Sequence, residues 1–379
     1  MPSPPNEDRR PRINTGGLAR QLLSWLGRGR HLEQMAPTAR RGPVTHVVIL
    51  DGTMSSLEPG RETNAGLTWK LLRELSPAAD LSVRYEPGIQ FTSWRQVRDV
   101  AEGRGLNRQI RRSYGWLASR YRPGDRIFLF GYSRGAYAVR SLAGVIDRIG
   151  LLRPEAATER NVHMAYRHYR TIPDSHGARE FARLFCHAAV EVQMIGAWDT
   201  VKALGLRLPV VWRWSSMAHR FHNHALGPTT RSGFHALALN ETREAYRPVM
   251  WRLDGAWDGD CEQVWFPGTH GDVGGQLDGV RAARPLANIS LVWMLQKAEA
   301  QGLRLPEGWR ARFGTDPQAP SIGLNRGWGR IFVARTPRVV GADRSERLHP
   351  SVLARGAVGP DAEGLPVAED AAVRRPAAP

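Results

Sequence analysis

Short apolar runs alternate with helix-like segments along most of this chain. The runs have the length and the apolar, often β-branched content of strands buried on both faces of a sheet. They lie at 45–50, 82–85, 127–130, 190–197 and 263–266. Segments with a helical spacing of apolar residues lie between and after them, at 64–75, 105–121, 136–146, 234–246 and 289–300, with shorter pieces inside 153–185. This alternation predicts an α/β fold with a mostly parallel, doubly wound sheet.

The composition changes toward both ends of the chain. Residues 1–41 are rich in Pro and Arg, and we expect a basic, disordered leader, with a short amphipathic helix over 18–32 as the alternative. Residues 336–379 are Pro, Ala, Gly and Arg with little pattern, which predicts a disordered tail. We expect one large α/β domain over 42–335, in which the weakly periodic stretch 203–233 is a candidate cap over the site.

One stretch, 126–146, joins a strand, a sharp turn and a helix in the sequence RIFLFGYSRGAYAVRSLAGVI. Its Gly-x-Ser-x-Gly pattern places Ser133 at the apex of the turn, as in the nucleophile elbow of a serine hydrolase. Gly131 and Gly135 stand where strand and helix pass too closely for a side chain. The stretch therefore predicts a three-layer α/β-hydrolase-like fold with helical insertions and Ser133 as the nucleophile.

A serine nucleophile needs a histidine base and a carboxylate that orients the histidine, and α/β hydrolases place them in the order Ser, acid, His. Asp199 follows the predicted strand 190–197, and His270 follows 263–266. Because parallel strands end at one edge of the sheet, we expect Ser133, Asp199 and His270 to meet there. Two alternatives remain for the acid: Asp199 is a helix N-cap, or the acid is one of the loop residues Asp254, Asp258 and Asp260.

The other histidines are candidates for the base or for a metal site. His219, His222 and His224 form a cluster, but no carboxylate or cysteine stands at ligand spacing from them. His235 falls on a predicted helix and is expected to be an ordinary core residue. We therefore expect neither a metal nor a cofactor.

An oxyanion hole needs two backbone N–H groups directed at the developing negative charge. We expect one from Arg134, the residue after the nucleophile, and the other from Gly52 or Thr53 in the loop after the first strand. The alternative is that Asp51 and Thr53 only cap that turn. The Arg134 side chain places a cation beside the nucleophile, which favours anionic substrates or a structural ion pair.

The net charge of the chain indicates anionic partners but does not distinguish between the kinds of anion. The 379 residues carry a formal net charge of +17. Nucleic acid, an anionic membrane surface and acidic substrates all fit such a balance, as does an arginine-rich proteome. The arginines are scattered, without a basic patch interleaved with aromatic residues, so we expect no nucleic-acid partner. Two cysteines cannot form a disulfide framework and predict reduced thiols.

The hydrophobic runs also bear on location. None approaches the length of a membrane span, and the basic N-terminal segment makes a poor signal peptide because Arg20 interrupts it. We therefore expect a protein made in the cytoplasm, whose export would use a signal-independent route.

Several segments together resemble a known family. They are DGT at 51–53, TN at 63–64, GYSRGAYAVRSLAG at 131–144, IGAWDTVKALG at 195–205, FHALALNETREAYRP at 234–248 and WFPGTHGDVGG at 265–275. Over about 44–300 they resemble the uncharacterised α/β-hydrolase family that includes catalytic domains of type VI secretion phospholipase effectors. Two positions depart from it: Asn240 stands where the family usually has an acid, and Gln276 replaces the third glycine of a GGG run.

The resemblance implies the same nucleophile, acid and base, and the cleavage of phospholipid acyl esters without a metal. We expect a carboxylic ester hydrolase of the phospholipase A or lysophospholipase kind, whose partners are a lipid or other ester and an anionic membrane surface. The alternative is a basic, hydrolase-like module that binds nucleic acid or another anion without catalysis.

Overall fold

A computed structural model describes residues 41–90, 104–201, 225–253, 257–325, 332–356, 362 and 364–368. The helices and strands of these described residues all lie in the unit Pro43–Pro379. Several sequence expectations fall outside the described residues: the leader up to 40, Asp254, the histidine cluster at 219–224 and the candidate cap from 203 to 224. Among the described residues, no helix combines the length and the apolar character that a membrane crossing requires.

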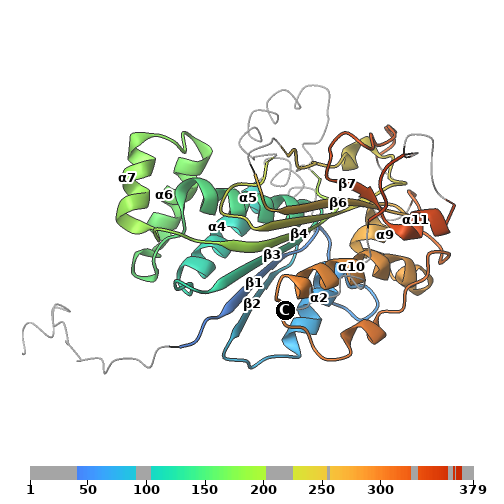
Figure 1. Cartoon of the computed structure of the whole chain (residues 1–379), viewed down its shortest axis with the longest axis horizontal. Helices are drawn as coiled ribbons and strands as arrows, with labels where there is room; N and C mark the ends of the chain where they lie inside the picture. Colours follow the sequence, from blue (N-terminus) through green and yellow to red (C-terminus); the bar gives the residue numbers. More distant parts are fainter. Residues whose placement is uncertain are drawn as a thin grey trace, which may run out of the picture. The chain divides into compact units, whose positions relative to one another are not determined.

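Seven strands of the described chain form one sheet in the order β2-β1-β3-β4-β5-β6-β7, and every pair is parallel (Figure 1). The strands are β1 (Thr45–Leu50), β2 (Leu81–Glu86), β3 (Arg126–Tyr132), β4 (Val192–Trp198), β5 (Ser232–Ala238), β6 (Asp260–Phe266) and β7 (Glu346–Leu348). Five of them fall on the predicted strand positions. The predicted α/β class, with a parallel sheet, is confirmed.

Helices connect the strands. The longer ones are α2 (Asn64–Arg73), α4 (Arg104–Ala118), α5 (Arg134–Ile149), α6 (Glu159–Arg170), α7 (His176–Phe185) and α10 (Arg284–Ala300). Shorter pieces are α9 (His270–Gly274), α11 (Pro350–Ala354), and the 3₁₀ turns η1 (Pro154–Ala156), η3 (Glu244–Tyr246), η4 (Arg281–Ala283) and η5 (Trp309–Arg312). The predicted helices over 64–75, 105–121, 136–146 and 289–300 are confirmed.

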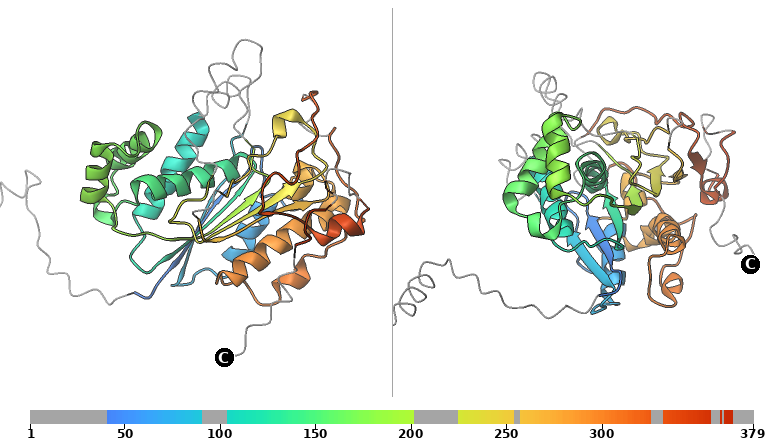
Figure 2. Two further views of the ribbon diagram at one scale, coloured as in Figure 1. Left: turned by 45° about the horizontal axis from the view of Figure 1, so that its top comes forward. Right: turned by 60° about the vertical axis from the view of Figure 1, so that its left-hand side comes forward.

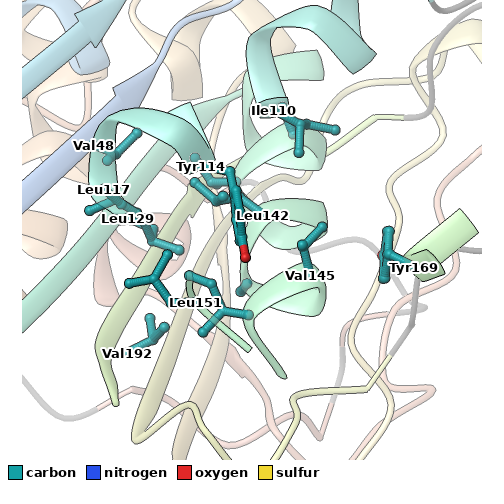
Figure 3. Packing of buried hydrophobic residues seen from close by; sticks show 14 of the residues in the cluster. Val48, Ile110, Tyr114, Leu117, Leu129, Leu142, Val145, Leu151, Tyr169 and Val192 are labelled. Atoms are coloured by element: carbon teal, nitrogen blue, oxygen red, sulfur yellow. The ribbon is translucent and has the colours of Figure 1, made fainter. Parts of the chain in front are cut away.

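The sheet lies between two helical layers. Val48 and Leu50 point into a core with α4, α5, α6 and α7, which Figure 3 shows from close by. Their neighbours Val47 and Ile49 point into a second core with α2 and α10. This alternation follows from the two-residue period of a strand, and burial on both faces explains why 47–50 is apolar at every position. Figure 2 shows the orange α10 and the teal and green helices on opposite sides of the sheet.

The helix predicted over 234–246 is wrong. Residues 232–238 form β5, which pairs with both β4 and β6 and is fully buried, while only Glu244–Tyr246 makes a helical turn. A short run that is apolar on every side fits a buried strand and a buried helix equally well by its pattern. His235 is therefore a strand residue. Its Nε2 accepts a hydrogen bond from the Thr200 amide at 3.1 Å, and burial lowers its pKa to about 3.

The expected disordered tail beginning at 336 does not hold for the described residues. β7 pairs with β6, so the sheet continues past the predicted domain end at 335. The amide of Leu348 also donates to the Pro366 carbonyl. The segment is held by these backbone hydrogen bonds and by a small apolar cluster, in which Leu348 and Val352 pack against Trp265. Its apolar residues are too few and too irregularly spaced to give a periodic pattern in the sequence. Cys186 and Cys261 are both free thiols, as expected.

Candidate active site

Ser133 occupies the turn between β3 and α5 in a backbone conformation that non-glycine residues rarely adopt, with φ at 57°. The two glycines of the elbow explain how strand and helix come so close. A Cβ added to Gly131 would lie 2.5 Å from the Gly135 carbonyl oxygen, and one added to Gly135 would collide with the Leu50 carbonyl. Any side chain at either position would push the helix away from the sheet and move Ser133.

The structure brings together the three residues that the sequence singles out. His270 begins α9, after the short loop 267–269 that follows β6, and its Nε2 lies 2.9 Å from Ser133 Oγ. Its Nδ1 lies 2.5 Å from Oδ2 of Asp199, which follows β4. All three side chains are almost completely buried. The result is a continuous hydrogen-bonded chain from a hydroxyl through an imidazole to a carboxylate.

The alternatives for the acid are not supported. No helix begins at Asp199, because Val201 instead forms an isolated bridge with Pro248. Asp260 begins β6 and so lies at the opposite edge of the sheet from His270, with Asp258 just before it. Asp199 itself has a positive φ of 41°, which turns its side chain out of the strand direction toward the histidine.

Asp199 has more partners than the sequence predicts. Its Oδ1 accepts hydrogen bonds from the Ala238 amide at 3.0 Å and from Arg338 Nη1 at 2.5 Å. Its Oδ2 lies next to His270 Nδ1 and also accepts a hydrogen bond from Arg338 Nη2 at 2.8 Å. Burial alone would raise the pKa of Asp199, but the charge and hydrogen bonds of Arg338, with those of His270, hold it well below its usual range. Asp199 is therefore ionised near neutral pH.

Two tyrosine rings contact the imidazole of His270. Tyr132 stacks on it, with the ring centroids 4.9 Å apart and the planes inclined by 29°. The Tyr246 ring packs against it at a centroid distance of 4.6 Å and an angle of 30°. The Arg243 guanidinium lies over the Tyr246 ring at 4.3 Å. Arg243 is also paired with the buried carboxylate of Glu241, which accepts a hydrogen bond from the His270 amide at 3.1 Å. These contacts fix the position of the histidine ring. Tyr132 ends β3, whereas the other partners lie in the segment 241–246, for which the sequence gives no signal of a contact with His270.

The loop after β1 lies directly against the nucleophile. A Cβ added to Gly52 would lie 2.5 Å from Tyr132 Cδ1 and 3.4 Å from Ser133 Cβ, so only glycine fits there. The Gly52 amide, however, donates to Asp51 Oδ1 at 2.7 Å, so the free oxyanion donor expected at Gly52 is not observed. Thr53 Oγ1 is buried and has no hydrogen-bond partner among the described residues. Gly52 thus provides space for close approach, and Thr53 stays the candidate donor from this loop.

Asp51 anchors this loop. Its Oδ2 accepts hydrogen bonds from Thr63 Oγ1 at 2.6 Å and from Tyr85 Oη at 2.7 Å. Burial raises the pKa of Asp51 to about 6, although the hydrogen bonds from Thr63, Tyr85 and the Gly52 amide each act to lower it. The idea that Asp51 only caps a turn therefore understates its role: it ties the loop to α2 and β2.

Asn240 and Gln276, the two residues that depart from the family pattern, both form hydrogen bonds near the site. Asn240 Oδ1 accepts a hydrogen bond from the Gly268 amide at 2.7 Å, in the turn that leads to His270. Gln276 Nε2 donates to the Thr53 carbonyl at 3.1 Å, and its Oε1 accepts from Tyr132 Oη at 3.3 Å. Gln276 thus bridges the histidine loop and the loop after β1. No cluster of three potential metal ligands occurs among the described residues.

Comparison with known proteins finds a matching family. The family described as T6SS phospholipase effector Tle1-like, catalytic domain, matches residues 45–297. An uncharacterized Saccharomyces cerevisiae protein, YEL023C, is 30% identical over 186 residues, covering 42% of this chain and 27% of that protein.

Two solved structures are similar at low identity. An uncharacterized protein from Pseudomonas aeruginosa aligns with a TM-score of 0.42 and 16% identity, over 80% of this chain and 53% of that one. The Tle1 effector bound to the VgrG spike of the type 6 secretion system aligns with a TM-score of 0.36 and 18% identity, over 62% and 52%. The chain spans from about a quarter to about half of the proteins that it matches.

Proposed function

The chain belongs to the family of T6SS Tle1-like phospholipase effector catalytic domains, and from this premise we propose that it is a serine hydrolase of lipid acyl esters. The observation that carries the proposal is the hydrogen-bonded chain from Ser133 through His270 to Asp199. The strained backbone at Ser133 supports it further, because strain of this kind clusters at functional sites.

In the proposed reaction, Ser133 Oγ attacks the acyl carbonyl carbon while its proton passes to His270 Nε2. Asp199 accepts the hydrogen bond of the Nδ1–H group, which keeps Nε2 free to take the proton and stabilises the imidazolium that forms. His270 then gives the proton to the departing alcohol oxygen, and an acyl-enzyme remains. A water molecule attacks this ester with His270 again as the base, and the carboxylic acid leaves.

The developing oxyanion needs donors beside Ser133. We assign the backbone N–H of Arg134 as one donor, because Arg134 directly follows the nucleophile at the first residue of α5, the position that supplies an oxyanion-hole amide in a nucleophile elbow. We assign the second to Thr53, through its amide or its buried hydroxyl. The positive end of the α5 dipole adds to the stabilisation of negative charge at this point.

Lipid esters are the proposed substrates, with phospholipase A or lysophospholipase activity as the specific form. The family supports this choice. Arg134 also supports it: burial lowers its pKa to about 10, so it still carries a positive charge at neutral pH beside the nucleophile. An anionic headgroup or an anionic membrane surface is the partner that such a cation would attract.

The experiment is hydrolysis of short p-nitrophenyl esters and of phospholipid vesicles by the wild type and by Ser133→Ala. We expect loss of both activities with the melting temperature preserved, because the Ser133 hydroxyl is bonded to His270 Nε2 and its removal leaves the elbow backbone unchanged. Ser141→Ala is the matched control, since that serine lies in α5, two turns after the elbow, and its hydroxyl donates to the Tyr137 carbonyl at 2.8 Å. Activity retained in Ser133→Ala would contradict the proposal.

A further inference from the structure

We propose that Arg338, which lies outside the part of the chain matching the family, is a positioning residue that locks the carboxylate of Asp199 toward His270. This inference rests on the proposed serine-hydrolase function. It adds a fourth side chain to the Ser133–His270–Asp199 arrangement and makes the C-terminal segment part of the site.

The geometry is that of a bidentate clamp. Nη1 and Nη2 of Arg338 each bond one oxygen of Asp199, at 2.5 and 2.8 Å. The two side chains are 3% and 0% exposed, so water does not compete for these hydrogen bonds. A carboxylate held on both oxygens by a planar guanidinium cannot rotate about its Cβ–Cγ bond without breaking two charge-assisted hydrogen bonds. Oδ2 therefore stays directed at Nδ1 of His270.

The charge of Arg338 matters as much as its shape. A carboxylate buried without a counter-charge takes up a proton, and a protonated Asp199 would not reliably accept the Nδ1–H of His270. His270 could then place its proton on Nε2, where it would block the transfer from Ser133. Arg338 provides a permanent positive charge, so that Asp199 stays ionised while the imidazole is still neutral. The clamp thus favours the reactive tautomer before substrate arrives.

A backbone ladder holds Arg338 in place. The Glu244 amide donates to the Ala334 carbonyl at 3.0 Å, and the Thr336 amide donates to the Thr242 carbonyl at 2.7 Å. The segment 334–338 therefore runs along the loop that carries Tyr246. Nη2 of Arg338 also donates to the Tyr246 carbonyl at 2.8 Å. One guanidinium thus fixes both the acid behind the histidine and the residue whose ring stacks on it.

Arg338→Met is the first test, because it removes the charge and the donors while keeping most of the side-chain volume. We expect kcat on a p-nitrophenyl ester to fall by about 100-fold, as misplacement of a catalytic group by about 1 Å does. KM should stay within about twofold, because the residue does not touch substrate. Arg338→Lys keeps the charge but not the fork, and should recover part of the loss. Arg335→Met is the matched control: it lies three residues earlier, is exposed, and should behave as wild type.

Arg338→Ala allows a rescue experiment that also guards against misfolding. Added ethylguanidinium should restore part of kcat, whereas ethylammonium at the same ionic strength should restore much less, because only the former presents a planar pair of donors. Arg338→Met with kcat within about threefold of wild type, or Arg338→Ala with no guanidinium-specific rescue in a folded protein, would overturn the proposal.

A readout without turnover separates this inference from the proposed function. The proton shared by His270 Nδ1 and Asp199 should give a far-downfield proton resonance in the wild type, in Ser133→Ala and in Arg335→Met. We expect the resonance to disappear or shift strongly upfield in folded Arg338→Met, even if no ester were hydrolysed. An unchanged resonance in that variant would show that Arg338 does not position Asp199. Absence of esterase activity in the wild type would instead count against the proposed function.

Discussion

The imidazole of His270 packs against the ring of Tyr246 in a tilted arrangement, with the centroids 4.6 Å apart and the planes inclined by 30°. A stacked ring restrains the histidine and offers its negative face to the imidazolium that forms during proton transfer. The contact couples the proposed base to the loop at 242–246, which also pairs with the C-terminal segment.

Replacing Tyr246 by Leu should therefore lower kcat by up to about tenfold, since aromatic contacts contribute about 0.5–1.5 kcal/mol. Tyr246→Phe keeps the ring and should stay near wild type. Steady-state kinetics on a soluble ester measures both. Equal rates for the Leu and Phe variants would show that the stacking does not assist the reaction.

Gln276 is the second target, because it joins the loop of His270 to the loop of Thr53. Gln276→Ala removes hydrogen bonds to the Thr53 carbonyl and to Tyr132, and we expect kcat to fall several-fold as the oxyanion loop loses its restraint. The free energy of unfolding should fall by about 1 kcal/mol. Gln318→Ala is the matched control, since this exposed glutamine bonds the Ala354 carbonyl on the surface. A kcat equal to that of the control would rule out the bridging role.

Asp51 should make stability depend on pH. Burial raises its pKa from the ordinary 3.8 to about 6, so the folded state holds a proton that the unfolded state has lost between those values. The contribution of Asp51 to the free energy of unfolding is then fully present below about pH 4 and decreases as the pH rises toward 6. The total decrease is about 3 kcal/mol, and the contribution stays low at higher pH. Denaturant unfolding at several pH values should show this fall in the wild type relative to Asp51→Asn. Asp258→Asn, at an exposed position, should follow the wild type.

If the two curves for wild type and Asp51→Asn keep a constant separation from pH 4 to 7, Asp51 does not carry the raised pKa. The comparison between variants is needed because Asp199, whose pKa is lowered, contributes in the opposite direction as the unfolded state ionises.

Arg134 provides a prediction about substrate charge. Its guanidinium is the cation next in sequence to the nucleophile, so Arg134→Ala should lower the rate on anionic phospholipid vesicles more than on zwitterionic ones. Arg134→Lys should keep the preference, because it keeps the charge. An unchanged ratio of the two rates in the Ala variant would leave Arg134 with a structural role alone.

The parts of the site that the sequence predicts share one property: each follows a strand. Ser133 and Asp199 come directly after β3 and β4, and His270 follows β6 after the short loop 267–269, so strand prediction places them at one edge. Arg338 and Tyr246 reach the same place through loops whose course depends on tertiary contacts. Arg338 in particular lies in a stretch of Pro, Arg and Ala whose order comes from hydrogen bonds to other loops.

The errors in the sequence-based predictions have a similar origin. β5 has a continuous apolar sequence because it is buried between β4 and β6, and such a run carries no period that separates strand from helix. The Gly52 amide was expected to be a free donor because it follows β1, but the neighbouring carboxylate of Asp51 takes its hydrogen bond. Local sequence indicates where a loop lies, whereas the partners of its amides depend on the folded surroundings.

The central claim is that His270 and Asp199 activate Ser133 as a nucleophile. Its most direct test is labelling with a fluorophosphonate probe, followed by mass spectrometry of the modified peptide. The account predicts that the wild type is labelled at Ser133 and that His270→Ala and Asp199→Asn are labelled far more slowly. Labelling at another residue, or labelling of Ser133 at an equal rate in all three proteins, would contradict it.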